Sequence, residues 1–167
     1  MEFVNLVLGV YTASRPTTDT VNDKIFQLRM KPKKKFDYNE MSSENQIFYV
    51  KETSDTYREK IVRNILEKLL DRPFPSCKPR WLINPHTKRR LEIDCFNEDL
   101  RLAVEIDGEQ HSRFLPHFHK TYDEFVKQQE RDIMKNGMIQ NKGIKLIRIP
   151  HYIRTNDLEK YIISQLF

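Results

Sequence analysis

Residues 91–111, LEIDCFNEDLRLAVEIDGEQH, read as two short strands joined by a tight connection, and both are apolar enough to be buried. Side chains alternate between the two faces of a strand, so the apolar residues of each strand share one face. The opposite face carries Asp94, Glu105 and Asp107. The segment therefore predicts a buried hairpin with carboxylates on one face.

The length of the connection decides whether these acids meet. With an even-length loop, such as Glu98-Asp99 alone, Asp94 lies opposite Ala103, and Glu105 is its diagonal neighbour on the same face, roughly 7–8 Å away. An odd-length loop places the two acids on opposite faces. Carboxylates at the closer spacing can share one cation, with oxygen ligands about 2.0–2.1 Å from Mg²⁺.

Three acids on one face repel one another and raise one another's pKa, and a divalent ion removes that penalty. The alternative is a solvated sheet face on which Asp94 and Glu105 form ion pairs, which contribute little to stability. The candidate partners in that case are Lys88, Arg90 and Arg101.

The segments around the hairpin show helical or strand periodicity. Helices are predicted at residues 57–70, 122–138 and 156–167, and strands at 46–50, 81–84, 90–95, 101–107 and 145–149. Thr56 and Glu59 match a capping box, and Gly143 is a candidate helix cap. This order predicts an α/β fold with a mixed sheet and helices packed on it.

The chain of 167 residues fits one domain with an appendage. Residues 54–167 are assigned to that domain, and residues 1–53 to an N-terminal extension of unclear role. In the extension, residues 4–11 are a short apolar run, and residues 12–23 are polar and predicted to form a loop.

Two basic runs stand out in a chain of net charge +5. Residues 24–36 and 72–91 each contain six Lys or Arg and no acid. Such clusters suit nucleic acid, although either run alone is equally typical of a solvated surface. The candidate nucleic-acid-binding residues are Lys33, Lys34, Lys35, Lys88, Arg89 and Arg90.

Two cysteines are too few for a disulfide framework, and the chain has no ligand pair such as C-x₂-C for zinc. No apolar run approaches the ~20 residues of a membrane span, and the first residues lack the basic start of a secretory signal. We therefore expect a soluble intracellular protein, cytoplasmic or nuclear, that does not bind membranes.

The ordered combination of Asp94, Glu105-Ile-Asp107, the string EIDGEQH, a helix with QQERDIMK and a strand GIKLIRIP resembles the PD-(D/E)xK nuclease superfamily. It is most similar to a subgroup related to very-short-patch-repair and Glu-Asp-His-Asp homing endonucleases, over roughly residues 56–150. The resemblance implies a restriction-endonuclease-like sheet of about four mixed strands flanked by helices. It also implies cleavage of DNA with Mg²⁺, with Mn²⁺ as a substitute.

The resemblance assigns Asp94 and Glu105 to the metal, and it places a further glutamate on the first helix. Glu59 lies at the edge of that helix's apolar arc, whereas Glu67 points toward solvent, so Glu59 is the candidate. Its alternative role, compatible with the first, is the capping box with Thr56.

The superfamily's lysine position, two residues after Glu105, holds Asp107 instead. Subgroup members without that lysine place a histidine just downstream, and His111 fits that position. A catalytic role is favoured because imidazole can transfer protons near neutral pH. The alternative for His111 is a local turn contact. His117 and His119 lie in a predicted loop and receive no role.

On the following helix, Gln128, Asp132 and Lys135 form one stripe beside an apolar face of Tyr122, Phe125, Val126 and Ile133. Asp132 fits the subgroup's final aspartate, and Lys135 is an alternative source of positive charge. An ordinary Asp–Lys pair along the helix is the other interpretation.

These residues support the hypothesis of a metal-dependent endodeoxyribonuclease acting on double-stranded DNA. Because the usual lysine is missing, the alternative is an inactive nuclease-fold protein that serves as a nucleic-acid-binding or virion component. The sequence leaves open a homodimer and a viral or phage origin.

Nucleic-acid binding through the basic runs should be electrostatic, so affinity should fall steeply with salt. Charge reversal of Lys33, Lys34 and Lys35, or of Lys88, Arg89 and Arg90, should weaken binding measured by fluorescence anisotropy. Unchanged affinity in both triple variants would mean that the runs are solvated surface.

Overall fold

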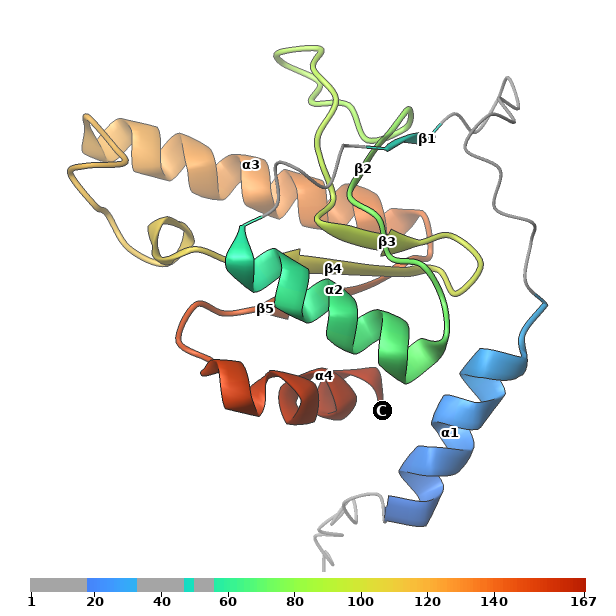
Figure 1. The fold of residues 1–167 in the computed structure, drawn as a ribbon. Coiled ribbons are helices and arrows are strands. Elements are labelled where there is room, and N and C mark those ends of the chain that lie inside the picture. The colour runs from blue at the N-terminus through green and yellow to red at the C-terminus, as the bar shows by residue number, and fades with distance from the viewer. Residues whose placement is uncertain (1–17, 33–46, 50–55) are drawn as a thin grey trace, which may run out of the picture.

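The computed structural model describes residues 18–32, 47–49 and 56–167 (Figure 1). The helices are α1 (Thr18–Met30), α2 (Tyr57–Leu70), α3 (Tyr122–Asn141) and α4 (Leu158–Leu166), with 3₁₀ turns η2 (Glu109–His111) and η3 (Thr155–Asp157). The strands are β1 (Ile47–Tyr49), β2 (Cys77–Pro79), β3 (Cys95–Asn97), β4 (Leu102–Ile106) and β5 (Lys145–Ile149). Residues 4–11 and Lys33, Lys34 and Lys35 lie outside the described residues.

The central sheet is mixed, with strand order β3-β4-β5. Strand β4 pairs antiparallel with β3 and parallel with β5. The parallel pair requires a long crossover, and α3 provides it. A separate antiparallel pair joins β1 to β2. The predicted mixed α/β class is confirmed, with three strands in the central sheet of the described part.

The two faces of this sheet pack against different helices (Figure 1). One face presents Leu102 and Val104 to apolar residues of α2 and α4. The other presents Phe96 and Ala103 to Ile139 near the end of α3. The period-2 alternation predicted for the hairpin thus places apolar residues on both faces, and the acids lie beyond them on the α3 side.

Helix α2 has the predicted bounds because local signals define both ends. The Thr56 hydroxyl accepts the Glu59 N–H and the Glu59 carboxylate accepts the Thr56 N–H, so the predicted capping box is confirmed. Asp71 takes a left-handed conformation after the last turn. Glu67, predicted to face solvent, instead accepts the Phe74 N–H at 3.0 Å.

The predicted strand at residues 81–84 is wrong, and β3 begins at Cys95 rather than at residue 90. In place of the predicted strand and of the first part of the predicted hairpin strand, the structure has two isolated β-bridges, which pair Ile83 with Arg90 and Cys77 with Ile93. The cause is local: the Asn84 side chain accepts the N–H groups of His86 and Thr87 and closes a tight loop.

Helix α1 corrects the loop predicted for residues 12–23, because residues 18–23 are helical. Tertiary contacts hold this helix: Ile25 is buried, and Arg29 donates to the carbonyls of Lys68 and Leu69 at the end of α2. Helix α3 runs to Asn141, three residues beyond the predicted end at 138, and Gly143 follows with a φ of 67°. Its predicted apolar face is partly wrong, because Tyr122 and Ile133 are exposed.

Leu66 is fully buried between α2 and the sheet, so Leu66→Ala should lower the free energy of unfolding by about 2–5 kcal/mol. Asn64→Ala, at an exposed position of the same helix, should change it by less than about 0.5 kcal/mol. Urea denaturation followed by circular dichroism measures both. Equal effects would contradict the packing of α2.

Candidate active site

The β3–β4 connection brings Asp94 and Glu105 together. Cys95 pairs with Val104 and Asn97 with Leu102, so residues 98–101 form the even-length loop on which the shared face depends. Continuing this register places Asp94 opposite Glu105, two residues further along than the pairing with Ala103 predicted for a two-residue loop. The Asp94 Oδ2 atom accepts the Ile106 N–H at 2.8 Å, which anchors the carboxylate at the end of β4.

Asp94 is held from α2 as well. The buried Arg63 guanidinium donates to the carbonyls of Phe74 and Asp94, at 2.8 and 3.0 Å. Loss of hydration on burial raises the pKa of Asp94, and the negative charges of Glu59 and Glu92 add to this effect. The Ile106 N–H and the positive charge of Lys135 oppose it.

Glu59 has the capping role considered for it. It completes the capping box of α2, and its negative charge adds a smaller contribution to the pKa of Asp94, which burial raises. The start of α2 thus faces the carboxylates of the sheet. A catalytic role for Glu59 stays a prediction.

Glu105 is a buried acid with one paired and one unpaired oxygen. Its Oε2 atom lies 2.5 Å from the Lys135 Nζ atom, while Oε1 is buried with no hydrogen-bond partner among the residues that the structure describes. Burial raises the pKa of Glu105 to about 7 despite the opposing charge of Lys135. The surface ion pair considered for Glu105 is therefore wrong, because its partner comes from α3 across a buried face.

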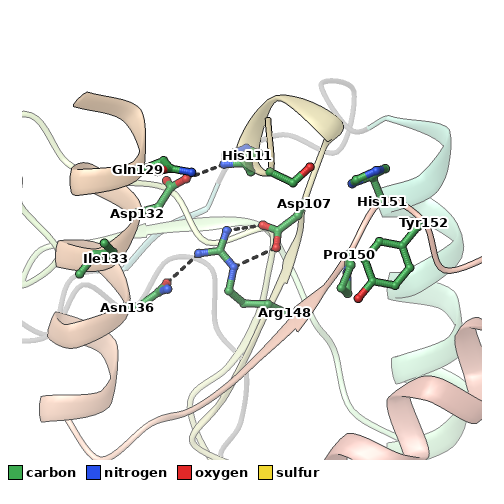
Figure 2. A pocket seen from close by; sticks show the side chains of 11 residues that line it. Asp107, His111, Gln129, Asp132, Ile133, Asn136, Arg148, Pro150, His151 and Tyr152 are labelled. Atoms are coloured by element: carbon green, nitrogen blue, oxygen red, sulfur yellow. Dashed lines mark hydrogen bonds and ion pairs between the residues drawn. The ribbon is translucent and has the colours of Figure 1, made fainter. Parts of the chain in front are cut away.

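Asp107, in the place of the superfamily's lysine, binds Arg148 of β5 through both carboxylate oxygens (Figure 2). Arg148 also donates to Asn136 Oδ1 at 3.0 Å. The sequence reasoning missed Arg148, although an arginine within the apolar strand KLIRI was a usable signal. Strand pairing places Arg148 beside Glu105, so it adds positive charge near both acids.

His111 and Asp132 form a second pair. The Nδ1 atom of His111, in η2, lies 2.6 Å from Asp132 Oδ2 on α3. Burial opposes ionisation of Asp132, but the hydrogen bond and charge of His111, with Arg148 and Arg131, lower its pKa overall. Asp132 is therefore an ionised acceptor that holds the imidazole.

The α3 stripe is directed toward this region rather than paired along its own helix. Lys135 contacts Glu105, Asp132 contacts His111, and Gln128 contacts His111 and His119. The interpretation of Asp132 and Lys135 as an ordinary helix pair therefore does not describe their contacts.

A pocket of about 400 Å³ opens beside these pairs (Figure 2). His111, Asp132, Asp107 and Arg148 line it, and Figure 2 shows the Asp107–Arg148 pair in its middle. The other lining residues are Ser112, Gln129, Ile133, Asn136, Pro150, His151 and Tyr152. Asp94, Glu105 and Lys135 do not line the pocket, whereas Asp107, two residues after Glu105, and Asp132, one turn before Lys135 on α3, do.

Other predicted residues lie apart from the pocket. Lys88, Arg89 and Arg90 are exposed near the tip of the loop closed by Asn84. Cys77 and Cys95 are free and buried. Within residues 18–32, 47–49 and 56–167, no three His, Cys, Asp or Glu side chains form a group that could hold a metal, so a metal here would rest on two carboxylates. In the same residues no helix is long and apolar enough to cross a membrane.

Sequence comparison finds relatives in three viruses. The chain is 36% identical over 137 residues to "Uncharacterized protein 307L" of Invertebrate iridescent virus 6, covering 71% of this chain and 68% of that protein. It is 34% identical over 110 residues to "Uncharacterized protein 094L" of Frog virus 3 (isolate Goorha), covering 65% and 70%. It is 38% identical over 114 residues to "Uncharacterized protein 033L" of Invertebrate iridescent virus 3, covering 68% of this chain.

The chain belongs to the protein family that includes 307L and 094L. It spans 59% of the length of 033L. The viral relatives agree with a viral origin. No established family description and no solved structure matches the chain.

The raised pKa of Glu105 predicts a pH-dependent stability. The folded state binds this proton more tightly than the unfolded chain, whose glutamate pKa is near 4.5. The free energy of unfolding should therefore fall by roughly 3 kcal/mol as the pH rises from about 4.5 to about 7. Glu105→Gln should remove most of this slope.

Urea denaturation at a series of pH values measures that slope. Glu130→Gln, at an exposed position of α3, should keep the wild-type pH dependence. The same slope in wild type and Glu105→Gln would show that Glu105 does not hold a proton near neutral pH.

Proposed function

We propose that this chain is a metal-dependent endonuclease that hydrolyses phosphodiester bonds in double-stranded DNA, on a restriction-endonuclease-like fold. One observation carries the proposal: Asp94 and Glu105 meet at the end of β4, beside Lys135 and next to the His111–Asp132 pair. A purely structural hairpin has no need for two crowded carboxylates with raised pKa values.

The donor set fits a hard divalent cation such as Mg²⁺, with Mn²⁺ as a substitute. Carboxylate oxygens are the ligands that these ions prefer, and Glu105 Oε1 is a buried oxygen that has no partner in the described part of the chain. Asp94 and Glu105 would hold the ion between them, which would relieve their mutual repulsion. When bound, such an ion activates water and stabilises charge on the phosphate.

Positive charge beside Glu105 comes from elements other than β4. Lys135 binds its carboxylate from α3, and Arg148 adds charge from β5. Both favour the ionised Glu105 that a metal requires. These two residues together take the electrostatic place of the lysine that Asp107 replaces.

His111 is the proposed general base or transition-state donor. Asp132 occupies Nδ1, so Nε2 is the nitrogen left for proton exchange at the pocket. Glu59 and Asp132 orient the site from α2 and α3. Lys88, Arg89 and Arg90, together with Lys33, Lys34 and Lys35, are the proposed contacts to the DNA backbone.

Single-turnover cleavage of double-stranded DNA with Mg²⁺ tests the proposal. His111→Ala should lower the rate by roughly 10²–10⁴ and leave DNA binding and folding intact. Lys135→Ala should cost less, and Asp94→Asn should be inactive. Full activity in His111→Ala with loss in Lys135→Ala would assign proton transfer to the lysine.

Thermal unfolding with added Mg²⁺ gives a readout independent of cleavage, because a ligand that binds only the folded state raises its stability. Mg²⁺ should raise the melting temperature of wild type and His111→Ala but not of Asp94→Asn. Absence of both cleavage and Mg²⁺ stabilisation in wild type would overturn the proposal. It would leave the alternative of an inactive nuclease-fold protein.

A further inference from the structure

His119 is a buried histidine outside the pocket, with both ring nitrogens hydrogen-bonded. Its exposure is 3%, and it lies between Phe114, stacked at 5.8 Å, and Phe125, edge-on at 5.3 Å. Its Nδ1 atom is 3.2 Å from the Leu115 N, and its Nε2 atom is 2.8 Å from Gln128 Oε1. These contacts join the loop after η2 to the α3 stripe.

The hydrogen positions along this chain of contacts follow from what each group can donate. A backbone N–H only donates, so His119 Nδ1 is the acceptor. The Nε2 atom therefore carries the proton and donates it to Gln128 Oε1. The amide oxygen of Gln128 is thus turned toward His119. Its nitrogen lies on the other side, 3.2 Å from His111 Nδ1.

This orientation matters because His111 Nδ1 has one proton to donate. The ionised Asp132 at 2.6 Å takes it in a charge-assisted hydrogen bond. The Gln128 amide nitrogen can only donate, and a protonated Nδ1 cannot accept from it, so in this tautomer their 3.2 Å contact is not a hydrogen bond and adds no second acceptor. A rotated amide would place Oε1 near His111 Nδ1, where it would compete with Asp132 for the proton and for the direction of the ring.

We infer that His119 and Gln128 are positioning residues for His111: His119 locks the Gln128 amide, and the locked amide leaves Asp132 as the single acceptor of the His111 Nδ1 proton. The inference rests on the proposed function only for the catalytic role of His111, not for its hydrogen bonds. Neither residue touches the reacting atoms.

Two substitutions of His119 separate hydrogen bonding to Gln128 from packing. The amide nitrogen of a glutamine can occupy the place of imidazole Nε2, so His119→Gln can still donate to Gln128. The shorter His119→Asn can mimic only Nδ1, so it can accept the Leu115 N–H but cannot reach Gln128. Both changes lose the ring contacts with Phe114 and Phe125.

Nitrogen-15 NMR of the DNA-free protein measures the result. In wild type and His119→Gln, His111 should be the Nδ1-protonated tautomer, and the Gln128 side-chain amide should give one set of signals. In His119→Asn, the Gln128 amide should exchange between orientations, and the His111 tautomers should mix. No change in His119→Asn, or equal changes in both variants, would overturn the inference.

Gln128→Glu provides a second test that leaves His119 in place. The carboxylate still accepts the His119 Nε2–H, but its other oxygen becomes a competing acceptor for His111 Nδ1–H. The Asp132 hydrogen bond should weaken, visible as a changed His111 Nδ1 shift, whereas an unchanged shift would contradict the inference.

Cleavage assays test whether the His119–Gln128 hydrogen bond affects turnover. His119→Asn and Gln128→Glu should lower kcat by about 10–100-fold, the usual cost of losing an outer-shell partner, with KM unchanged and with rescue in His119→Gln. An inactive wild type would overturn the proposed function, whereas the NMR result would still show whether His119 fixes the orientation of the Gln128 amide. A normal kcat in His119→Asn with a disordered Gln128 amide would overturn its catalytic use.

Discussion

One buried carboxylate, Glu105 on the middle strand, creates the constraint that its neighbours satisfy. A charged group at 7% exposure is costly unless it is paired. Its neighbours along β4 are apolar, and Arg148, beside it on β5, is hydrogen-bonded to Asp107. The pair comes from Lys135, 30 residues later on α3. The position of α3 across the sheet is therefore as much an electrostatic requirement as a packing one.

The parallel pairing of β4 and β5 makes this arrangement possible. A parallel connection needs a crossover, and the twenty-residue α3 is long enough to reach from the η2 turn to the far end of the sheet. One stripe of that helix presents Gln128, Asp132 and Lys135 at successive levels along β4 and η2. The two ion pairs and the pocket are thus consequences of a single helix–sheet contact.

Only one carboxylate oxygen of Glu105 is satisfied by this contact. An unpaired buried oxygen has a large desolvation cost, which the fold tolerates in the residues described here. Buried polar atoms without a hydrogen-bond partner are found especially at functional sites, where a bound ligand supplies the missing interaction. A cation shared by Asp94 and Glu105, as proposed above, would give Glu105 Oε1 a partner and would offset the burial that raises the pKa of Asp94.

Local chemistry in the sequence determined the bounds of α2 and β5 and the antiparallel hairpin. Caps and alternation act over a few residues, so they can be read without a structure. Residues 81–84 are an exception, because the Asn84 side chain closes a turn where the alternation of the sequence predicts a strand. The length of the β3–β4 loop, and with it the register that joins Asp94 to Glu105, came from the structure. Only the tertiary structure decided the partners: Lys135 for Glu105, Arg148 for Asp107, Asp132 for His111 and Gln128 for His119. Three of these pairs are separated by 21 to 41 residues, and all four depend on how α3 and β5 lie against β4 and the segment that follows it, a geometry that no local pattern contains.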